Sequence, residues 1–158
     1  MLPRLLPVLL AVAGAALAQK YDGPVPAKAD LPYLKHADTL VPTEAAEAKE
    51  ENHKDDVVYV VDGATSSART PLTSPIFLLK AHKLQADKLQ LYKLESKSGR
   101  REVLFSHKKK QKAMPIRMEV TRLSADNLYK IEVDDTLDNG EYSLTPDGSN
   151  QVFCFAVY

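Results

Sequence analysis

The side chains best able to bind a metal ion are four histidines and a single cysteine, and they are scattered along the chain. The histidines are His36, His53, His82 and His107, and the cysteine is Cys154. No two of them have the H-x-H or H-E-x-x-H spacing that places ligands side by side on a strand or a helix. The sequence therefore predicts surface or loop histidines, and neither a metal ion nor another cofactor.

Nucleophilic catalysis would need an activated serine or cysteine, and no G-x-S-x-G motif is present. Ser66, Ser67 and Ser74 lie in a polar loop that ends at a proline. With six glycines in total, the chain also has no phosphate-binding or dinucleotide-binding loop. These observations favour a non-catalytic protein. The alternative is a small secreted enzyme whose residues converge from separate loops, with residues 63–75 and the neighbourhood of His107 as candidates.

Two interpretations fit Cys154. In an extended strand, Cys154 lies on the same face as Val152 and Ala156, a face of small apolar residues. This position predicts a buried and inert thiol. The other hypothesis is a disulfide between two copies of the chain. A single cysteine cannot form an internal disulfide, so the fold must be held together by its core.

The strongest charge cluster consists of Lys108, Lys109, Lys110 and Lys112, between two predicted strands. One hypothesis is a loop that binds a polyanion, such as a surface polysaccharide or lipid headgroups. The other is a solvated hairpin tip whose charges discourage association between sheet edges. A formal net charge of zero and the lack of aromatic residues within the cluster favour the hairpin tip. They also argue against nucleic acid as a partner.

An acidic run that contains Asp134, Asp135 and Asp138 and ends at Gly140 has some likeness to a calcium-binding loop. In an EF-hand the glycine would come one place earlier, and a glutamate would stand where this chain has Thr145. The sequence therefore does not predict calcium binding.

Residues 1–18 have the three-part pattern of a signal peptide. A short segment with one positive charge, at Arg4, precedes an apolar run, and Ala16-Leu17-Ala18 supplies the small residues that signal peptidase requires. The apolar run contains Pro7 and is shorter than the about 20 residues of a membrane-spanning helix. We therefore expect an exported protein, periplasmic or secreted, with no membrane span after cleavage. Loss of Arg4 leaves 20 basic residues (21 − 1) against 21 acidic ones.

The exported chain is predicted to consist of an extended lead-in, residues 19–32, and one domain, residues 33–158. The lead-in contains three prolines and few apolar residues. Residues 43–56 are rich in Glu, Ala and Lys, and Thr43 could cap a helix. Their only apolar side chains are alanines, however, so a charged hairpin that turns at residues 52–55 fits the same segment. The sequence leaves both alternatives open.

From Val57 onward the pattern is that of short strands separated by turns. The predicted strands are residues 57–61, 76–79, 89–94, 102–105, 116–121, 129–133, 141–145 and 151–158. The last of them is apolar on both faces, as in a strand that is covered on both sides. Strands do not alternate with helices, so we predict an all-β fold, an antiparallel β-sandwich, with a small β-barrel as the alternative.

One motif makes the sandwich prediction more specific. Asp138-Asn139-Gly140-Glu141-Tyr142 has the form Asp-x-Gly-x-Tyr, which resembles the tyrosine corner of immunoglobulin-like domains. The resemblance implies a Greek-key sandwich in which the Tyr142 hydroxyl bonds to the backbone a few residues upstream. Leu144 stands where antibody-type domains have their second cysteine, and the chain has no Trp. A glycine turn followed by a core tyrosine is the alternative.

The function class that fits these features is an exported, non-catalytic β-domain that acts as a binding, adhesion or envelope-structural module. Its partner would be another envelope or extracellular protein, or a polyanionic surface, and nucleic acid is not expected. The sequence identifies no ligand.

Overall fold

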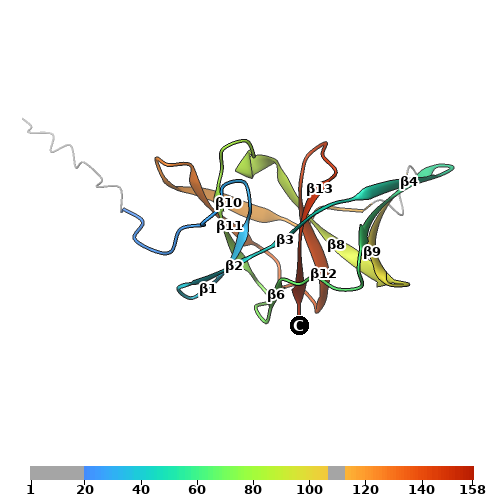
Figure 1. The fold of residues 1–158 in the computed structure, drawn as a ribbon, viewed down its shortest axis with the longest axis horizontal. Helices are drawn as coiled ribbons and strands as arrows, with labels where there is room; N and C mark the ends of the chain where they lie inside the picture. The colour runs from blue at the N-terminus through green and yellow to red at the C-terminus, as the bar shows by residue number, and fades with distance from the viewer. Residues whose placement is uncertain (1–19, 107–112) are drawn as a thin grey trace, which may run out of the picture.

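The computed structural model describes residues 20–106 and 113–158, and the regular secondary structure of these residues is almost entirely antiparallel β-strand (Figure 1). The predicted signal peptide lies outside the described residues. Within the described ranges, no helix has the length and apolar character needed to cross a membrane. The helical segment assigned there is the short 3-10 helix η1 (Ala86–Lys88).

Two sheets make up the fold. The first has the strand order β10 (Met118–Ser124), β11 (Leu128–Val133), β7 (Ile76–Lys80), β1 (Tyr33–His36) and β2 (Thr39–Pro42). The second has the order β3 (Glu44–Glu47), β13 (Gln151–Val157), β12 (Gly140–Pro146), β8 (Leu89–Lys97), β9 (Arg100–Ser106), β5 (Asp56–Asp62) and β4 (Lys49–His53). The short strand β6 (Arg69–Thr70) runs parallel to β13 at the side of this second sheet.

The second sheet curls into a half-barrel because its two edge strands are halves of one continuous segment. β3 pairs with β13, β4 pairs with β5, and only Ala48 separates β3 from β4. The amide of Ala48 donates a hydrogen bond of 2.8 Å to the carbonyl of Asn150, which extends the pairing with the β13 side. Residues 44–53, which we call the bridging segment, thereby connect the two ends of the sheet. Figure 1 shows the curvature around β3, β4, β8, β9 and β12.

Strands β8 and β13 contribute to two hydrophobic cores, and β12 contributes to the larger of them. Their outward side chains, such as Leu91, Leu144 and Phe155, belong to the larger core, which the first sheet completes. Side chains of the opposite face, such as Leu94 and Val152, belong to a smaller core inside the half-barrel. One strand can serve both cores because successive side chains point to opposite faces of a sheet. The prediction of an internal last strand, covered on both faces, is confirmed.

The predicted all-β, antiparallel fold is confirmed as well. The structure combines the two alternatives that the sequence left open, because one sheet packs on the outer face of a second sheet that is itself curled. The hairpin predicted around Gly99 is present, with Lys97 paired to Arg100 between β8 and β9.

Residues 43–56 form the hairpin alternative, and the helix alternative is wrong. His53 pairs with Asp56 across the turn between β4 and β5. Thr43 does not cap a helix, because its hydroxyl donates to the carbonyl of Pro32 at 2.7 Å. Strand pairing prevails over helix propensity here because the edges of β13 and β5 offer backbone partners, and because small alanine side chains fit inside the half-barrel.

The lead-in contains no helix or strand over residues 20–32, yet it is tied to the domain. The Asp30 carboxylate accepts hydrogen bonds from the backbone amides of residues 82–84, the shortest of them 2.8 Å long. Burial alone would raise the pKa of Asp30, but these amide hydrogen bonds outweigh it and hold the pKa below its ordinary value. Asp30 therefore fixes the lead-in against the turn that follows β7.

Tyr142 has the local geometry that the tyrosine-corner motif predicts. Its hydroxyl donates a hydrogen bond of 2.7 Å to the carbonyl of Asp138, four residues upstream. The ring is buried and stacks on Phe155 with 5.5 Å between ring centroids. A glycine turn followed by a core tyrosine would have the same contacts, so the immunoglobulin-like assignment stays a prediction.

We expect Tyr142→Phe to lower the free energy of unfolding by about 1 kcal/mol, because the change removes a partly buried hydrogen bond made by a core side chain and keeps the ring. Urea denaturation followed by circular dichroism measures this. Tyr21→Phe is the matched control, since that hydroxyl donates to the carbonyl of Pro24 in the lead-in, outside both cores. A loss as small for Tyr142→Phe as for the control would contradict the expectation.

Candidate functional site

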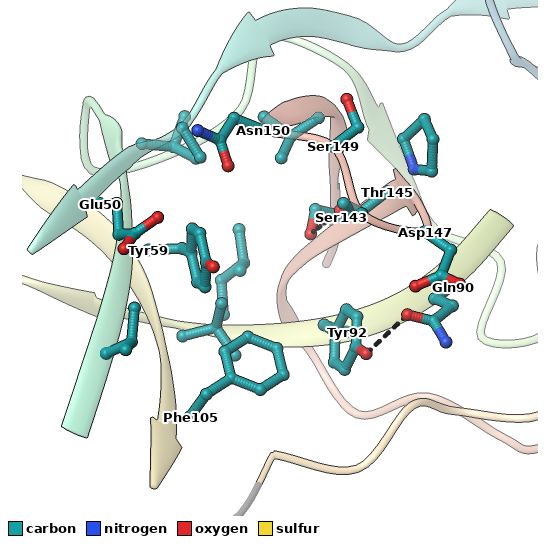
Figure 2. A pocket seen from close by; sticks show the side chains of 18 residues that line it. Glu50, Tyr59, Gln90, Tyr92, Phe105, Ser143, Thr145, Asp147, Ser149 and Asn150 are labelled. Atoms are coloured by element: carbon teal, nitrogen blue, oxygen red, sulfur yellow. Dashed lines mark hydrogen bonds between the residues drawn. The ribbon is translucent and has the colours of Figure 1, made fainter. Parts of the chain in front are cut away.

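The inner face of the half-barrel lines a cavity of about 520 Å3 that is open to solvent on one side. Its walls come from β4, β5, β8, β9, β12 and β13, and the turn between β12 and β13 borders one end (Figure 2). Most of the lining is apolar, and polar side chains such as Thr145, Ser149 and Asn150 gather near that turn. The cavity therefore has an apolar interior and a polar border at one end.

The lining follows from the alternation along each strand, since every second residue faces inward. The inward residues are Val57, Tyr59 and Val61 on β5, and Val103 and Phe105 on β9. On β8 they are Gln90, Tyr92 and Leu94, and on β12 they are Ser143 and Thr145. The strands that curl the sheet thus also supply the cavity with apolar walls and a few hydrogen-bonding groups.

Three aromatic rings lie together in the cavity, contributed by Tyr59, Tyr92 and Phe105. The Phe105 ring lies between the two tyrosine rings, with centroids 5.5 Å from Tyr59 and 5.3 Å from Tyr92. Both tyrosine rings stand nearly perpendicular to it, at 85° and 79°. Figure 2 shows Tyr59 and Tyr92 on opposite sides of the space above Phe105. We call this group the aromatic cage.

The polar side chains of the cavity are partly engaged with each other. The Tyr92 hydroxyl donates to Gln90 Oε1 at 2.9 Å, and the hydroxyls of Ser143 and Thr145 lie 3.3 Å apart. Burial raises the pKa of Tyr92, and the negative charge of Asp147 raises it further. Tyr92 therefore remains a neutral phenol at ordinary pH and can take part in hydrogen bonds with a ligand.

Arg101 lies at the closed end of the half-barrel, on the inward face of β9 beyond Val103. It is 1% exposed. Its guanidinium donates to Glu44 Oε1 at 2.7 Å and to the backbone carbonyls of Asp62 and Gly63 at 2.7 and 2.9 Å. This set of contacts joins β9 to the bridging segment and to the end of β5.

A second carboxylate completes the closed end. Glu141 Oε2 lies 3.9 Å from the Arg101 guanidinium and accepts the amide of Ser66 at 3.0 Å. Thr65 donates its hydroxyl to the other Glu141 oxygen, and the amide of Ser67 donates to Glu44. We call Arg101, Glu44 and Glu141 the floor cluster, because they hold the loop after β5 across the closed end.

Cys154 lies next to the floor cluster and has no exposed surface. Burial raises the pKa of its thiol to about 12, against a smaller opposing effect of Arg101. Such a thiol is neither a thiolate nucleophile nor able to reach another chain without unfolding. The predicted burial of Cys154 is confirmed, and the alternative of an intermolecular disulfide does not fit the folded protein.

The candidate residues that the sequence singled out do not form one site. Lys108, Lys109, Lys110 and Lys112 lie outside the described residues, as does His107. The other histidines have separate partners. The His36 side chain hydrogen-bonds to Thr70, the His53 ring lies beside the Glu51 carboxylate, and the backbone amide of His82 donates to the Asp30 carboxylate. No group of three or more His, Cys, Asp or Glu that could hold a metal ion occurs in the described part of the chain.

The loop serines have structural roles within the described residues. Ser66 and Ser67 use their amides to hold Glu141 and Glu44, and the Ser66 hydroxyl accepts the amide of Ala68 at 3.2 Å. The acidic run is also engaged, with Asp134 3.2 Å from Arg117 and Asp138 3.7 Å from Lys93. These contacts stabilise loops and strand ends.

The sequence did not reveal the cavity. A signal for it was nonetheless present in β12, where Glu141, Ser143 and Thr145 alternate with the core residues Tyr142 and Leu144. Polar residues on one face of a strand usually indicate that this face is exposed to solvent, but here the face points into the half-barrel. Only the closure of the sheet shows where they point.

No protein-family model, curated protein or solved structure matches this chain. The function must therefore be inferred from the geometry of the site.

We expect Arg101→Met to destabilise the fold by about 3–5 kcal/mol, because it leaves the buried Glu141 carboxylate and the partly buried Glu44 carboxylate without their cation. Urea denaturation at pH 7 measures the loss. Lys49→Met is the matched control, since it removes a cation from an ion pair with Asp62 that is exposed to water, and such pairs contribute little. Equal effects of the two substitutions would show that the floor cluster is not a stability determinant.

The stability of the protein should depend on pH through Glu44. Burial alone would raise the pKa of Glu44, but the hydrogen bonds from Arg101 and Ser67 lower it below its ordinary value of 4.5. A lowered pKa in the folded state adds stability that is complete above the unfolded value and is lost as the pH falls through the folded value.

The measurement is the free energy of unfolding of the wild type and of Glu44→Gln between pH 7 and pH 3. We expect the wild type to exceed the variant by most at pH 7, with the difference shrinking below about pH 4.5. A difference that does not change with pH would contradict the role of the Glu44 charge.

Proposed function

We propose that the protein is an exported, non-catalytic binding module that holds a small molecule with an apolar body inside the half-barrel. The observation that carries this proposal is the cavity of about 520 Å3 between the inward faces of the strands. Small-molecule sites in proteins typically have volumes of about 300–1,000 Å3 and an apolar lining with a few placed polar groups. The half-barrel cavity has both properties.

The walls of the cavity are held in place before any ligand binds. The bridging segment joins the two ends of the sheet, and the floor cluster fastens the loop after β5 beneath it. A preformed cavity avoids much of the entropic cost of ordering side chains on binding. This favours reversible binding by a stable scaffold.

The pattern of residues 1–18 supports a location outside the cytosol, in the periplasm or the medium. A fold held by two hydrophobic cores and a buried ion cluster needs no disulfide there, in keeping with a single, buried cysteine. The proposal therefore places a soluble ligand carrier or sensor domain in an extracytoplasmic compartment.

A neutral fluorescent probe, N-phenyl-1-naphthylamine, tests whether the cavity takes up apolar molecules. We expect a saturable increase in its fluorescence with one probe bound per chain. Val103→Trp places a bulky side chain in the cavity and should abolish the increase. Leu104→Trp is the matched control, because the next residue of β9 is not among the cavity's lining residues and is 37% exposed.

Both variants are first compared with the wild type by urea denaturation, so that loss of fold is not mistaken for loss of the cavity. Binding that is absent in the wild type, or equally strong in Val103→Trp and Leu104→Trp, would rule out the half-barrel as the binding site. Competition by a natural extract then provides a route to the physiological ligand.

A further inference from the structure

Among the described residues, the charged groups that line the cavity are all of one sign. Glu50 from β4 and Asp147 from the turn after β12 both border it. Among the described residues of the lining there is no Lys or Arg. Figure 2 places Glu50 on the side of Tyr59 and Asp147 on the side of Tyr92, so the two carboxylates flank the aromatic cage from different directions.

The aromatic cage adds a second feature that selects for a cation. The faces of aromatic rings carry partial negative charge and attract cations, and several rings at steep angles can surround one ammonium group. Phe105 with Tyr59 and Tyr92 standing nearly perpendicular to it has this arrangement. Quaternary ammonium groups are well suited to such a site because they are bulky, weakly hydrated and make no hydrogen bonds.

The cation at the closed end of the half-barrel is not available to an anionic ligand. Arg101 is 1% exposed and donates to Glu44 and to two backbone carbonyls. An anion inside the cavity would therefore meet two carboxylates and no free positive charge among the described lining residues. Both carboxylates are exposed at the border of the cavity, so this repulsion is strongest at low ionic strength.

From these observations we infer that the ligand of the cavity is an organic cation, an alkyl- or arylammonium compound whose charged head lies in the aromatic cage and whose apolar part lies along Val61, Leu94 and Val103. The inference rests on the proposed function, since it names the ligand class of the same cavity. The two carboxylates provide long-range attraction, and the rings provide close contact with the head group.

Isothermal titration of the purified protein with three probes of similar size tests the ligand class. The probes are hexyltrimethylammonium, octanoate and 1-octanol, which differ mainly in charge. We expect the ammonium compound to bind with one-to-one stoichiometry and at least tenfold more tightly than either of the others at low ionic strength. This binding should be lost in Val103→Trp and retained in Leu104→Trp.

Substitutions within the cage and at its border separate the two sources of affinity. Phe105→Leu should weaken binding of hexyltrimethylammonium by about fivefold, with little effect on octanol. Glu50→Gln and Asp147→Asn should each weaken it by about two- to fivefold, and added salt should reduce this difference. Asp126→Asn, in the exposed turn between β10 and β11, removes the same charge away from the cavity and should have no effect.

The outcomes distinguish failure of this inference from failure of the proposed function. If octanol or octanoate binds as tightly as the ammonium compound and is blocked by Val103→Trp, the cavity binds ligands but does not select cations. Ammonium binding that survives Phe105→Leu, Glu50→Gln and Asp147→Asn unchanged would also overturn the inference. If neither these probes nor N-phenyl-1-naphthylamine shows binding that Val103→Trp abolishes, the proposed function itself is wrong.

Discussion

A guanidinium that is almost entirely buried is tolerable only where its nitrogens are hydrogen-bonded. Each of the three Arg101 nitrogens has a hydrogen-bond partner, and these partners come from parts of the chain that are far apart in sequence. Arg101 pairs with Glu44 in the bridging segment, lies near Glu141 in β12, and donates to two carbonyls at the end of β5. Desolvating these charges is costly unless they remain paired, so strand arrangements that separate them are disfavoured. The cluster fastens the bridging segment and the loop after β5 to the sheet, whose curl follows from the strand pairing.

Because the sheet is curled, the two faces of β8, β12 and β13 lie in different environments. Their outer faces form the main core with the first sheet, while their inner faces border the cavity and the floor cluster. The same geometry explains the chemistry of Cys154. An inward position beside two carboxylates and away from water keeps its thiol protonated, so the residue contributes packing and no reactivity.

The cavity combines features that suit recognition of a small molecule. Its walls present apolar surface, the aromatic cage presents ring faces at steep angles, and Glu50 and Asp147 place two carboxylates at its border. Under the proposed function, these groups act on a ligand through contact and charge. Selectivity would therefore come from shape and charge, on a scaffold whose rigidity is provided by hydrogen bonds in the sheet and by buried ion pairs.

Local pattern in the sequence was sufficient for the class of fold, the internal position of the last strand, the burial of Cys154 and the Tyr142 hydrogen bond. Each depends on side-chain alternation or on contacts a few residues apart. The sequence could not decide between helix and hairpin for residues 43–56, because that choice depends on pairing with strands distant in the chain. Nor could it predict the cavity, since polar residues such as Ser143 look solvent-exposed until the sheet closes around them. Tertiary structure alone brings Tyr59, Tyr92 and Phe105 together, because their strands become neighbours only when the chain folds.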